Sequence, residues 1–166
     1  VGVIWTENGF RHLTNSRREV NAPADMRGLK VRTMENQVHM RAFSTLGALP
    51  TPMAFSELIP ALQQGTVDGQ ENPVNLFLGF RMDTLAQKHL SIWNYCADAA
   101  IFVASKSVMD SFAPADRELV IACAREAAKR QIAAARKGLG IDGDRSSIEE
   151  CVRRGVAVAE LTPAEK

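Results

Sequence analysis

Hydrophobic positions along the chain follow two spacings in turn, one typical of strands and one typical of helices. Residues 29–33 (LKVRT) alternate apolar and polar side chains after a turn that ends at Gly28, which predicts a strand. From Asn36 the apolar residues recur at helical spacing until Gly47, a natural C-terminal stop. The pattern therefore predicts a strand followed by a helix.

The same pattern repeats further along the chain. Prolines in residues 48–53 favour extended backbone, and Ser56 is expected to cap a helix that ends at Gly65 and holds Pro60 at the edge of its first turn. Strands alternating with helices predict an α/β fold, and the apolar strands are typical of a parallel sheet. The other predicted elements are strands at 66–70, 100–104 (buried) and 156–161, and helices within 71–80 and 147–153.

The longest helical signal begins after Pro114 and ends at Gly138, so we expect a helix of more than 20 residues. Its alanine content favours close packing. The apolar side is predicted to carry Leu119, Val120, Cys123, Ala127 and Ile132.

The composition fits an ordinary globular chain. Of the 166 residues, 46% are hydrophobic and 23% are charged, which is enough to bury a core. The 20 basic and 19 acidic side chains leave a net charge of +1, so no nucleic-acid partner is expected. The sequence has no apolar run of about 18 residues, so direct membrane insertion is not expected either.

The three cysteines do not predict a disulfide framework. Cys96, Cys123 and Cys151 are odd in number, far apart, and lack the C-x-x-C spacing of zinc or redox sites. Free cysteine behaves as a small hydrophobic residue, so we expect all three to pack in the core.

The sequence shows no pattern that predicts a cofactor, a metal or a catalytic group. Residues 138–143 (GLGIDG) match the dinucleotide pattern G-x-G-x-x-G, but they follow a predicted helix where the mechanism needs a strand. His12, His39 and His89 are too widely spaced to indicate a metal site. The sequence also lacks a G-x-S-x-G motif, so no catalytic residue is predicted.

Arg32 is the residue that most suggests binding chemistry. It lies in the predicted strand at residues 29–33, just before a helix that begins with Glu35 and Asn36. A planar guanidinium near a helix N-terminus suits a carboxylate ligand. Alternatively, Arg32 pairs with a structural acid such as Glu35 or Glu57, and the residues alone leave both interpretations open.

Three sequence blocks then resemble a known family. They are residues 29–32 (LKVR), 47–57 (GALPTPMAFSE) and 61–73 (ALQQGTVDGQENP), and the match extends upstream through 9–11 (GFR) and 24–29 (ADMRGL). In this order and spacing the blocks closely resemble the solute-binding proteins of TRAP transporters, the DctP type.

The resemblance implies a periplasmic binding protein-like α/β fold, with two lobes and a long bridging helix. Residues 9–97 with 138–166 would form most of the second ligand-binding lobe, and residues 98–137 would cross to the first. Residues 1–5 look like the middle of a strand, so we expect a fragment in which the N-terminal lobe is largely missing and the cleft is incomplete.

The resemblance also implies a function in transport without catalysis. The protein would be an extracytoplasmic, periplasmic subunit that captures a small organic acid and delivers it to the TRAP membrane permease subunits, with no cofactor. Two alternatives remain: a ligand-sensing regulatory module built from the same lobes, and an α/β enzyme that acts on a carboxylate.

Carried over by position, the resemblance implies the residues that hold the ligand. Arg32 would clamp the carboxylate through two hydrogen bonds, Arg11 would assist, Asn72 would hydrogen-bond the same group, and Phe55 would pack on the ligand body. Two cations and an amide would offset the desolvation of one carboxylate.

Glu35 and Asn36 complete the predicted site at the start of the following helix. A carboxylate at position 35 would repel a second acid group on the ligand but accept a hydrogen bond from a hydroxyl. We therefore hypothesise that the ligand is a monocarboxylic hydroxy acid and not a dicarboxylate.

Overall fold

The structure of the chain is a computed structural model that describes residues 1–141 and 143–162. Over these residues the chain forms a six-stranded sheet in the order β3-β2-β4-β1-β5-β6, which confirms the predicted α/β class. The strands are β1 (Gly2–Asn15), β2 (Lys30–Thr33), β3 (Leu49–Pro52), β4 (Gly69–Asn72), β5 (His89–Val103) and β6 (Ala157–Glu160). The α-helices are α1 (Gln37–Thr45), α2 (Phe55–Gln64), α3 (Val74–Gly79), α4 (Lys106–Ser111), α5 (Pro114–Arg136) and α6 (Ser146–Arg153), and 3₁₀ turns span Pro23–Met26 and Met82–Thr84.

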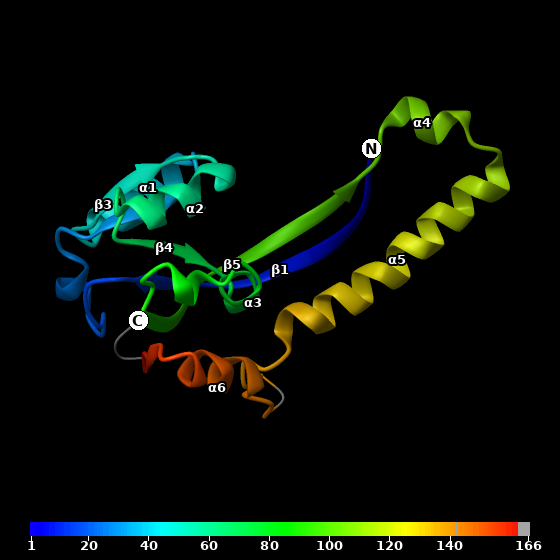
Figure 1. Cartoon of the computed structure of the whole chain (residues 1–166). Helices are drawn as coiled ribbons and strands as arrows, with labels where there is room; N and C mark the ends of the chain where they lie inside the picture. The colour runs from blue at the N-terminus through cyan, green and yellow to red at the C-terminus, as the bar shows by residue number, and fades with distance from the viewer. Residues whose placement is uncertain (142, 163–166) are drawn as a thin grey trace.

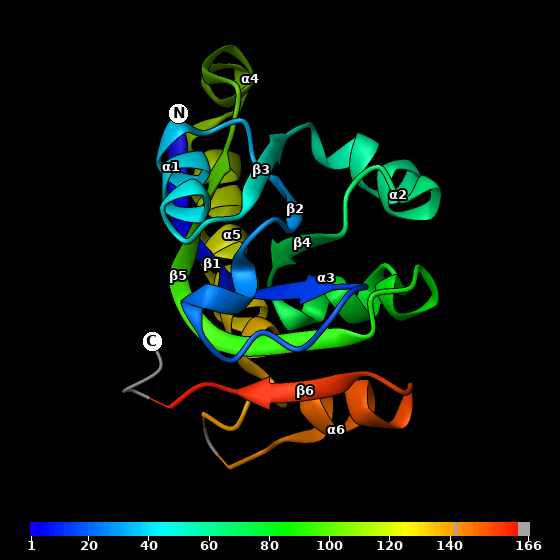
Figure 2. The same cartoon turned by 90° about the vertical axis from the view of Figure 1, so that its left-hand side faces the viewer.

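The sheet is mixed, whereas the apolar strands predicted a parallel one. β2 is parallel to β3 and β4, and β5 is parallel to β6. β1 lies between β4 and β5 and is antiparallel to both. Figure 2 shows α1 and α2 on opposite sides of the short strands β2 and β3.

Part of the chain extends away from this body as an arm, which we define as residues 2–8 of β1, residues 99–103 of β5, α4 and α5. In Figure 1 the paired ends of β1 and β5 run out to α4, and α5 returns along them to the body. The helix α5 has 23 residues, as the sequence predicted.

The arm corrects two predictions about burial. The strand expected to be buried at 100–104 exposes 50% of Phe102 and 64% of Val103. Leu119 on α5 is 61% exposed, while the buried face consists of Ala128 and Ala135. The reason is that in the arm α5 packs on a two-stranded ribbon, which covers one side of the helix.

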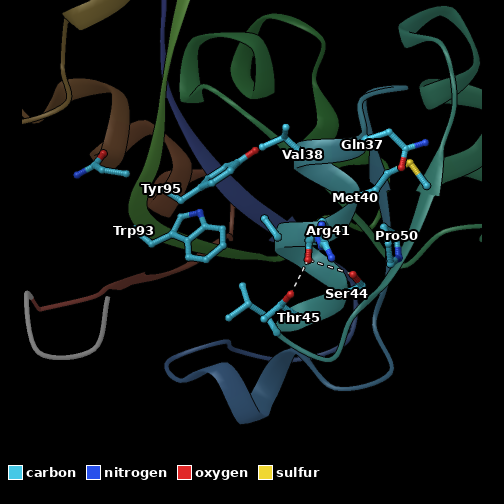
Figure 3. A pocket seen from close by; sticks show the side chains of 12 residues that line it. Gln37, Val38, Met40, Arg41, Ser44, Thr45, Pro50, Trp93 and Tyr95 are labelled. Atoms are coloured by element: carbon cyan, nitrogen blue, oxygen red, sulfur yellow. Dashed lines mark hydrogen bonds between the residues drawn. The ribbon is translucent and has the colours of Figure 1, made fainter.

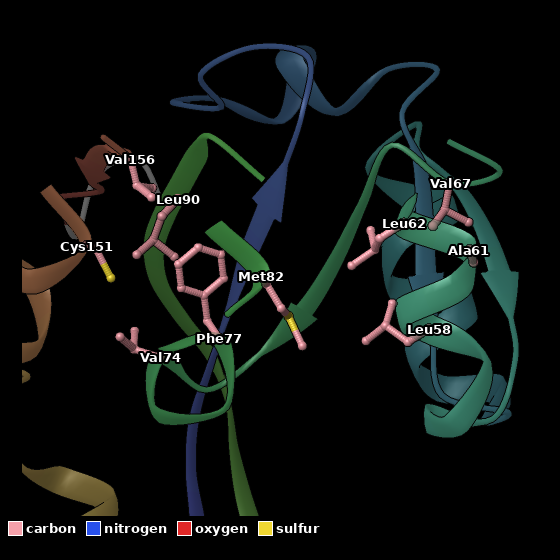
Figure 4. Close-up of a cluster of buried hydrophobic side chains, with 10 residues drawn as sticks. All are labelled: Leu58, Ala61, Leu62, Val67, Val74, Phe77, Met82, Leu90, Cys151 and Val156. Carbon is pink, nitrogen blue, oxygen red and sulfur yellow. The ribbon is translucent and has the colours of Figure 1, made fainter. Parts of the chain in front are cut away.

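Two apolar clusters hold the body together. One, drawn in Figure 4, joins α2, α3, β5 and α6 through Leu58, Phe77, Leu90 and Cys151. The other packs Phe43 of α1 against β1 and β2. The second cluster includes Val31 of β2, so it anchors the strand that carries Arg32.

The start of α2 differs from the prediction. The helix begins at Phe55, after Ala54, so Ser56 is not its cap. The Glu57 carboxylate accepts instead from the backbone N–H of Ala54, at 3.0 Å, which is the reciprocal bond of a capping box and not the bond that a capping serine hydroxyl would make. Pro60 is therefore inside the helix and not at the edge of the first turn.

The strand expected at 66–70 lies further along the chain, as β4. Gly65 takes a left-handed conformation (φ 69°) and ends α2, and the Thr66 N–H still bonds to the Ala61 carbonyl. These residues are therefore used to finish the helix. The shift places residues 70–72 in the sheet.

The cysteines differ in their burial. Cys151 is buried as expected, but Cys96 is half-buried and Cys123 is exposed on α5, so the prediction of core packing was wrong for Cys123. Residues 138–143 join α5 to α6, and Asp142 within that motif lies outside the described residues.

Candidate functional site

Buried polar side chains gather where β2 and β4 run side by side. Arg32 on β2 is the register partner of Gln70 on β4, and Asn72 on β4 is the partner of His12 on β1. Arg32 and Asn72 are each 3% exposed, and Arg11 on β1 is 2% exposed. The sheet order therefore brings the three predicted polar ligand residues into one cluster.

Arg32 is a buried cation without an acidic partner in the part of the chain that the structure describes. Its Nε and Nη2 donate to the Met53 carbonyl oxygen at 3.1 and 2.7 Å, and its guanidinium carbon lies 5.9 Å from the centre of the Phe55 ring. Among residues 1–141 and 143–162, no carboxylate lies within 4.0 Å of it, and its Nη1 has no hydrogen-bond partner. In this part of the chain, Arg32 therefore forms no ion pair with Glu35 or Glu57, which was the alternative interpretation.

Burial sets the ionisation of Arg32. Desolvation is the main reason that the pKa of Arg32 lies below its usual value, and the positive charge of Arg11 lowers it further. The negative charges of Glu71, Glu35 and Glu57 act in the opposite direction and do not restore it. The guanidinium would thus gain from an additional anion.

Arg11, in contrast, is neutralised inside the protein. Its Nε lies 2.5 Å from Glu71 Oε2, its Nη2 lies 2.9 Å from Glu71 Oε1, and its Nη1 donates to the Asp98 carboxylate. Burial alone would lower the pKa of Arg11, but the hydrogen bond and charge of Glu71, with Asp98, raise it above its usual value.

Arg11 also orients the predicted amide ligand. Its Nη2 donates to Asn72 Oδ1 at 2.9 Å, and Asn72 Nδ2 donates to Gln70 Oε1 at 2.5 Å. Gln70 in turn donates to the Thr14 hydroxyl at 2.9 Å. Asn72 therefore has both ends of its amide fixed by buried neighbours.

The other predicted residues lie at the edge of this cluster. Phe55 is half-buried and packs edge-on against Phe80, with ring centres 5.0 Å apart. Glu35 and Asn36 are exposed. Asn36 caps α1, because its Oδ1 accepts from the Val38 N–H at 2.8 Å and from the His39 N–H at 3.4 Å.

Sequence reasoning missed three members of the cluster. Glu71 is completely buried and accepts hydrogen bonds from Arg11 and from the Tyr95 hydroxyl, although its place beside Asn72 in the QENP block was a local signal. Asp98 and Tyr95 come from β5, far along the chain from Arg11, and only the pairing of β1 with β5 brings them here. No local pattern could have revealed them.

A separate groove is lined by α1 and β5. Figure 3 shows its walls, with Val38 and Arg41 on the helix and Trp93 and Tyr95 on β5. Its lining does not include Arg32, Arg11 or Asn72. Within the described residues there is no cluster of acids, histidines or cysteines that could hold a metal ion, and no helix long and apolar enough to cross a membrane.

Comparisons with known proteins now bear on this site. The family model described as "Bacterial extracellular solute-binding protein, family 7" matches residues 1–166. A solute-binding protein of Verminephrobacter eiseniae is 49% identical over 127 residues, which are 76% of this chain and 38% of that protein. The 2,3-diketo-L-gulonate-binding periplasmic protein of Escherichia coli is 35% identical over 129 residues, 78% of this chain and 39% of that protein.

Solved structures match the fold of almost the whole chain. A TRAP periplasmic solute-binding protein from Ralstonia eutropha, with bound (S)-2-acetolactate, has a TM-score of 0.95 and 42% identity. Another from Polaromonas, bound to D-erythronate, has a TM-score of 0.87 and 42% identity. In both cases the match covers 99% of this chain and 52% of the other, so the chain spans about half of their length.

Proposed function

Since the chain belongs to the bacterial extracellular solute-binding proteins of family 7, we propose that it binds the carboxylate of a small organic acid for a TRAP transporter. The protein would act in the periplasm, hand the acid to the membrane permease subunits and leave it chemically unchanged. The relatives and structures reported above are binding proteins, so we propose neither the ligand-sensing module nor the enzyme.

One observation carries this proposal: Arg32 is a buried guanidinium without a carboxylate partner in the described part of the chain. An isolated charge is costly to bury unless it is paired. Arg11, equally buried, already has two acidic partners. A ligand carboxylate would give Arg32 the partner it lacks, through the planar fork that suits two parallel hydrogen bonds.

The neighbouring side chains have complementary roles in this proposal. Phe55 would exclude water from one side of the ligand, because its ring already lies against Arg32. Asn72 would donate to the ligand carboxylate, and Arg11 would assist by holding the Asn72 amide and by adding positive charge. Asn36 would contribute indirectly, as the cap that starts α1 beside the site.

The ligand class follows from charge. Glu35 is exposed, and it lies close enough to Arg32 for its negative charge to raise the pKa of the guanidinium. A second carboxylate on the ligand would be repelled there, whereas a hydroxyl could donate to it. The two solved relatives at 42% identity hold (S)-2-hydroxy-2-methyl-3-oxobutanoate and D-erythronate. We therefore favour a monocarboxylic hydroxy acid over a dicarboxylate.

We also propose a division of the chain between two lobes. Residues 9–97 with 138–166 would form most of one lobe, apart from residues 142 and 163–166, which are outside the described part. Residues 98–137 would cross to the other lobe. In Figure 1 the arm, which holds most of these crossing residues, projects from the body.

The experiment is calorimetry on the intact protein with (S)-2-acetolactate, D-erythronate, pantoate and succinate. We expect a hydroxy monocarboxylate to bind more tightly than succinate. Arg32→Lys should weaken that binding about 10-fold to 100-fold, since charge-assisted hydrogen bonds contribute about 1.5–3 kcal/mol and an ammonium cannot reproduce the fork. Arg32→Ala should abolish it.

The matched control is Arg41→Lys, which makes the same replacement at an exposed position on α1 and should leave the affinity unchanged. Wild-type affinity in Arg32→Lys would rule out the clamp. Ligand recovered unchanged after prolonged incubation is expected, whereas turnover would favour an enzyme.

A further inference from the structure

A chain of hydrogen bonds runs from α1 to the buried carboxylate of Glu71. His39 Nδ1 lies 2.9 Å from the hydroxyl oxygen of Tyr95, and that hydroxyl donates to Glu71 Oε2. Tyrosine has a single hydroxyl proton, and here it goes to the carboxylate. The hydroxyl oxygen therefore accepts from His39, whose Nδ1 must carry a proton. All donors in the chain point toward Glu71.

The backbone of β5 is distorted where it presents Tyr95. Arg11 pairs with Cys96 and Leu13 pairs with Ser91, so residues 92–95 lie opposite His12 alone. Asn94 within this bulge has φ of +53°, a left-handed conformation that is uncommon outside glycine. Bulges and unusual dihedrals of this kind often re-aim a side chain at a functional site.

The bulge places the Tyr95 ring against other aromatic rings and its hydroxyl against Glu71. Its ring centre lies 4.7 Å from that of Trp93 and 5.6 Å from that of Phe43. Figure 3 shows Tyr95 and Trp93 next to each other, facing α1. The rings hold Tyr95 in place while its hydroxyl reaches Glu71.

The Tyr95 hydroxyl is a third donor to Glu71. Its carboxylate is completely buried, and Arg11 occupies it through Nε and Nη2. The Tyr95 hydroxyl adds a hydrogen bond from β5, whereas Arg11 donates from β1. The carboxylate is therefore held from two strands. Burial and the charge of Glu71 raise the pKa of Tyr95 above its usual value, so the phenol keeps the proton that it donates.

We propose that Tyr95 and His39 are positioning residues of the acid-binding site. They fix the Glu71 carboxylate, which orients Arg11, and Arg11 Nη2 in turn orients the Asn72 amide. This role rests on the function proposed above, because Asn72 and Arg32 are the groups that would meet the ligand.

The first test is Tyr95→Phe in the intact protein, which keeps the ring and removes the hydroxyl. Binding is measured by calorimetry with D-erythronate, or with whichever acid of the panel binds most tightly. We expect the affinity to fall about 10-fold, the size of one lost charge-assisted hydrogen bond, although the hydroxyl does not touch the ligand.

The second test uses two replacements of His39. Asparagine places an N–H donor close to the position of Nδ1, whereas leucine fills similar space without a donor. His39→Asn should stay within about twofold of the wild-type affinity, and His39→Leu should weaken binding about fivefold. A purely structural role would not distinguish the two in this order, and this pair decides the question if Tyr95→Phe does not fold.

Phe43→Leu is the control for packing. Phe43 contacts the same ring but makes no hydrogen bond to Glu71, so this variant should lower the melting temperature and leave the affinity unchanged. Equal loss of affinity in Phe43→Leu and Tyr95→Phe would overturn the positioning role, and so would wild-type binding by Tyr95→Phe.

Arg32→Lys, measured in parallel, separates this proposal from the function on which it rests. If Arg32→Lys weakens binding while Tyr95→Phe and His39→Leu do not, only the positioning role fails. If Arg32→Lys also binds like the wild type, the clamp fails, and the positioning role fails with it.

Discussion

Arg11 and Arg32 are almost equally buried, yet they have different hydrogen-bond and ion-pair partners. Arg11 is surrounded by the carboxylates of Glu71 and Asp98, and Arg32 donates to one backbone carbonyl. The resemblance to the family identified both positions as ligand residues. It gave Arg32 the clamp and Arg11 an assisting role, but it did not reveal the internal acidic partners of Arg11, because Asp98 reaches Arg11 only through the register of β1 and β5. Contact of Arg11 and Asn72 with the ligand remains a prediction.

Asp68 supports the same region by a different route, and its ionisation predicts how stability depends on pH. Burial would raise the pKa of Asp68, but the Lys30 N–H at 2.9 Å and Arg17 Nε at 2.7 Å lower it below its usual value. A carboxyl whose pKa is depressed by folding stabilises the protein above its unfolded pKa, about 3.9. That stability is lost as the pH falls through the lower, folded pKa.

We therefore expect Asp68→Asn to lower the free energy of unfolding by about 1 kcal/mol at pH 7, and by progressively less below pH 4. Urea titrations of both proteins at several pH values measure this. The control is Asp110→Asn, in an exposed ion pair with Lys106, which should change stability by less than about 0.5 kcal/mol at pH 7. A loss in Asp68→Asn that is the same at pH 3 and pH 7 would contradict the prediction.

At the scale of the elements, local patterns located the helices and strands better than they ordered them. The helix that ends at Gly47, the long helix after Pro114 and the strand before Arg32 are confirmed. Each has a strong local signal, either regular apolar spacing or a terminating glycine. The antiparallel placement of β1 has no such signal, because it depends on pairing with residues more than 50 positions away.

Gly69 shows how tightly that pairing is built. A Cβ at this position would lie 2.2 Å from the Thr14 carbonyl oxygen and 2.8 Å from the Asn15 Cβ. The first of these atoms belongs to the backbone of β1, so it cannot move without separating β1 from β4. The same two strands carry Arg11, Glu71 and Asn72.

Gly69→Ala should therefore lower the free energy of unfolding by about 3 kcal/mol, the upper part of the usual range for overpacking. Denaturation in urea measures the loss. Gly79→Ala, at the end of α3, is the matched control, since an added Cβ there meets no atom within 4 Å, and it should be neutral or slightly stabilising. Equal stability of the two variants would show that β1 and β4 can separate without penalty.

At the scale of the whole molecule, the chain combines a packed body with an arm that is covered on one side. The arm has an apolar surface that includes Ile101 at 45%, Phe102 at 50% and Leu119 at 61% exposed. Sequence pattern predicted apolar strand and helix positions here but not their exposure, because periodicity shows which side chains share a face and not what covers that face. The chain spans 52% of the solved relatives at 42% identity.

This difference predicts unequal local stability along one strand. The first part of β5 lies in the body, where Leu90 and Ser91 are each 1% exposed, and residues 99–103 of the same strand lie in the arm. Local opening takes less free energy where few apolar contacts must be broken. In the chain of residues 1–166, amides of 99–103 that bond to β1 should exchange with solvent at least about 10-fold faster than amides of 89–91 that bond to β1.

Hydrogen exchange followed by NMR or mass spectrometry measures this, and the two halves of β5 control for each other because both pair with β1. Restricting the comparison to amides that bond to β1 removes the effect of unpaired N–H groups at a sheet edge. Uniform protection along β5 would mean that the arm and the body open as one cooperative unit. In that case α5, which packs along β1, would stabilise the ribbon as fully as the apolar clusters stabilise the body.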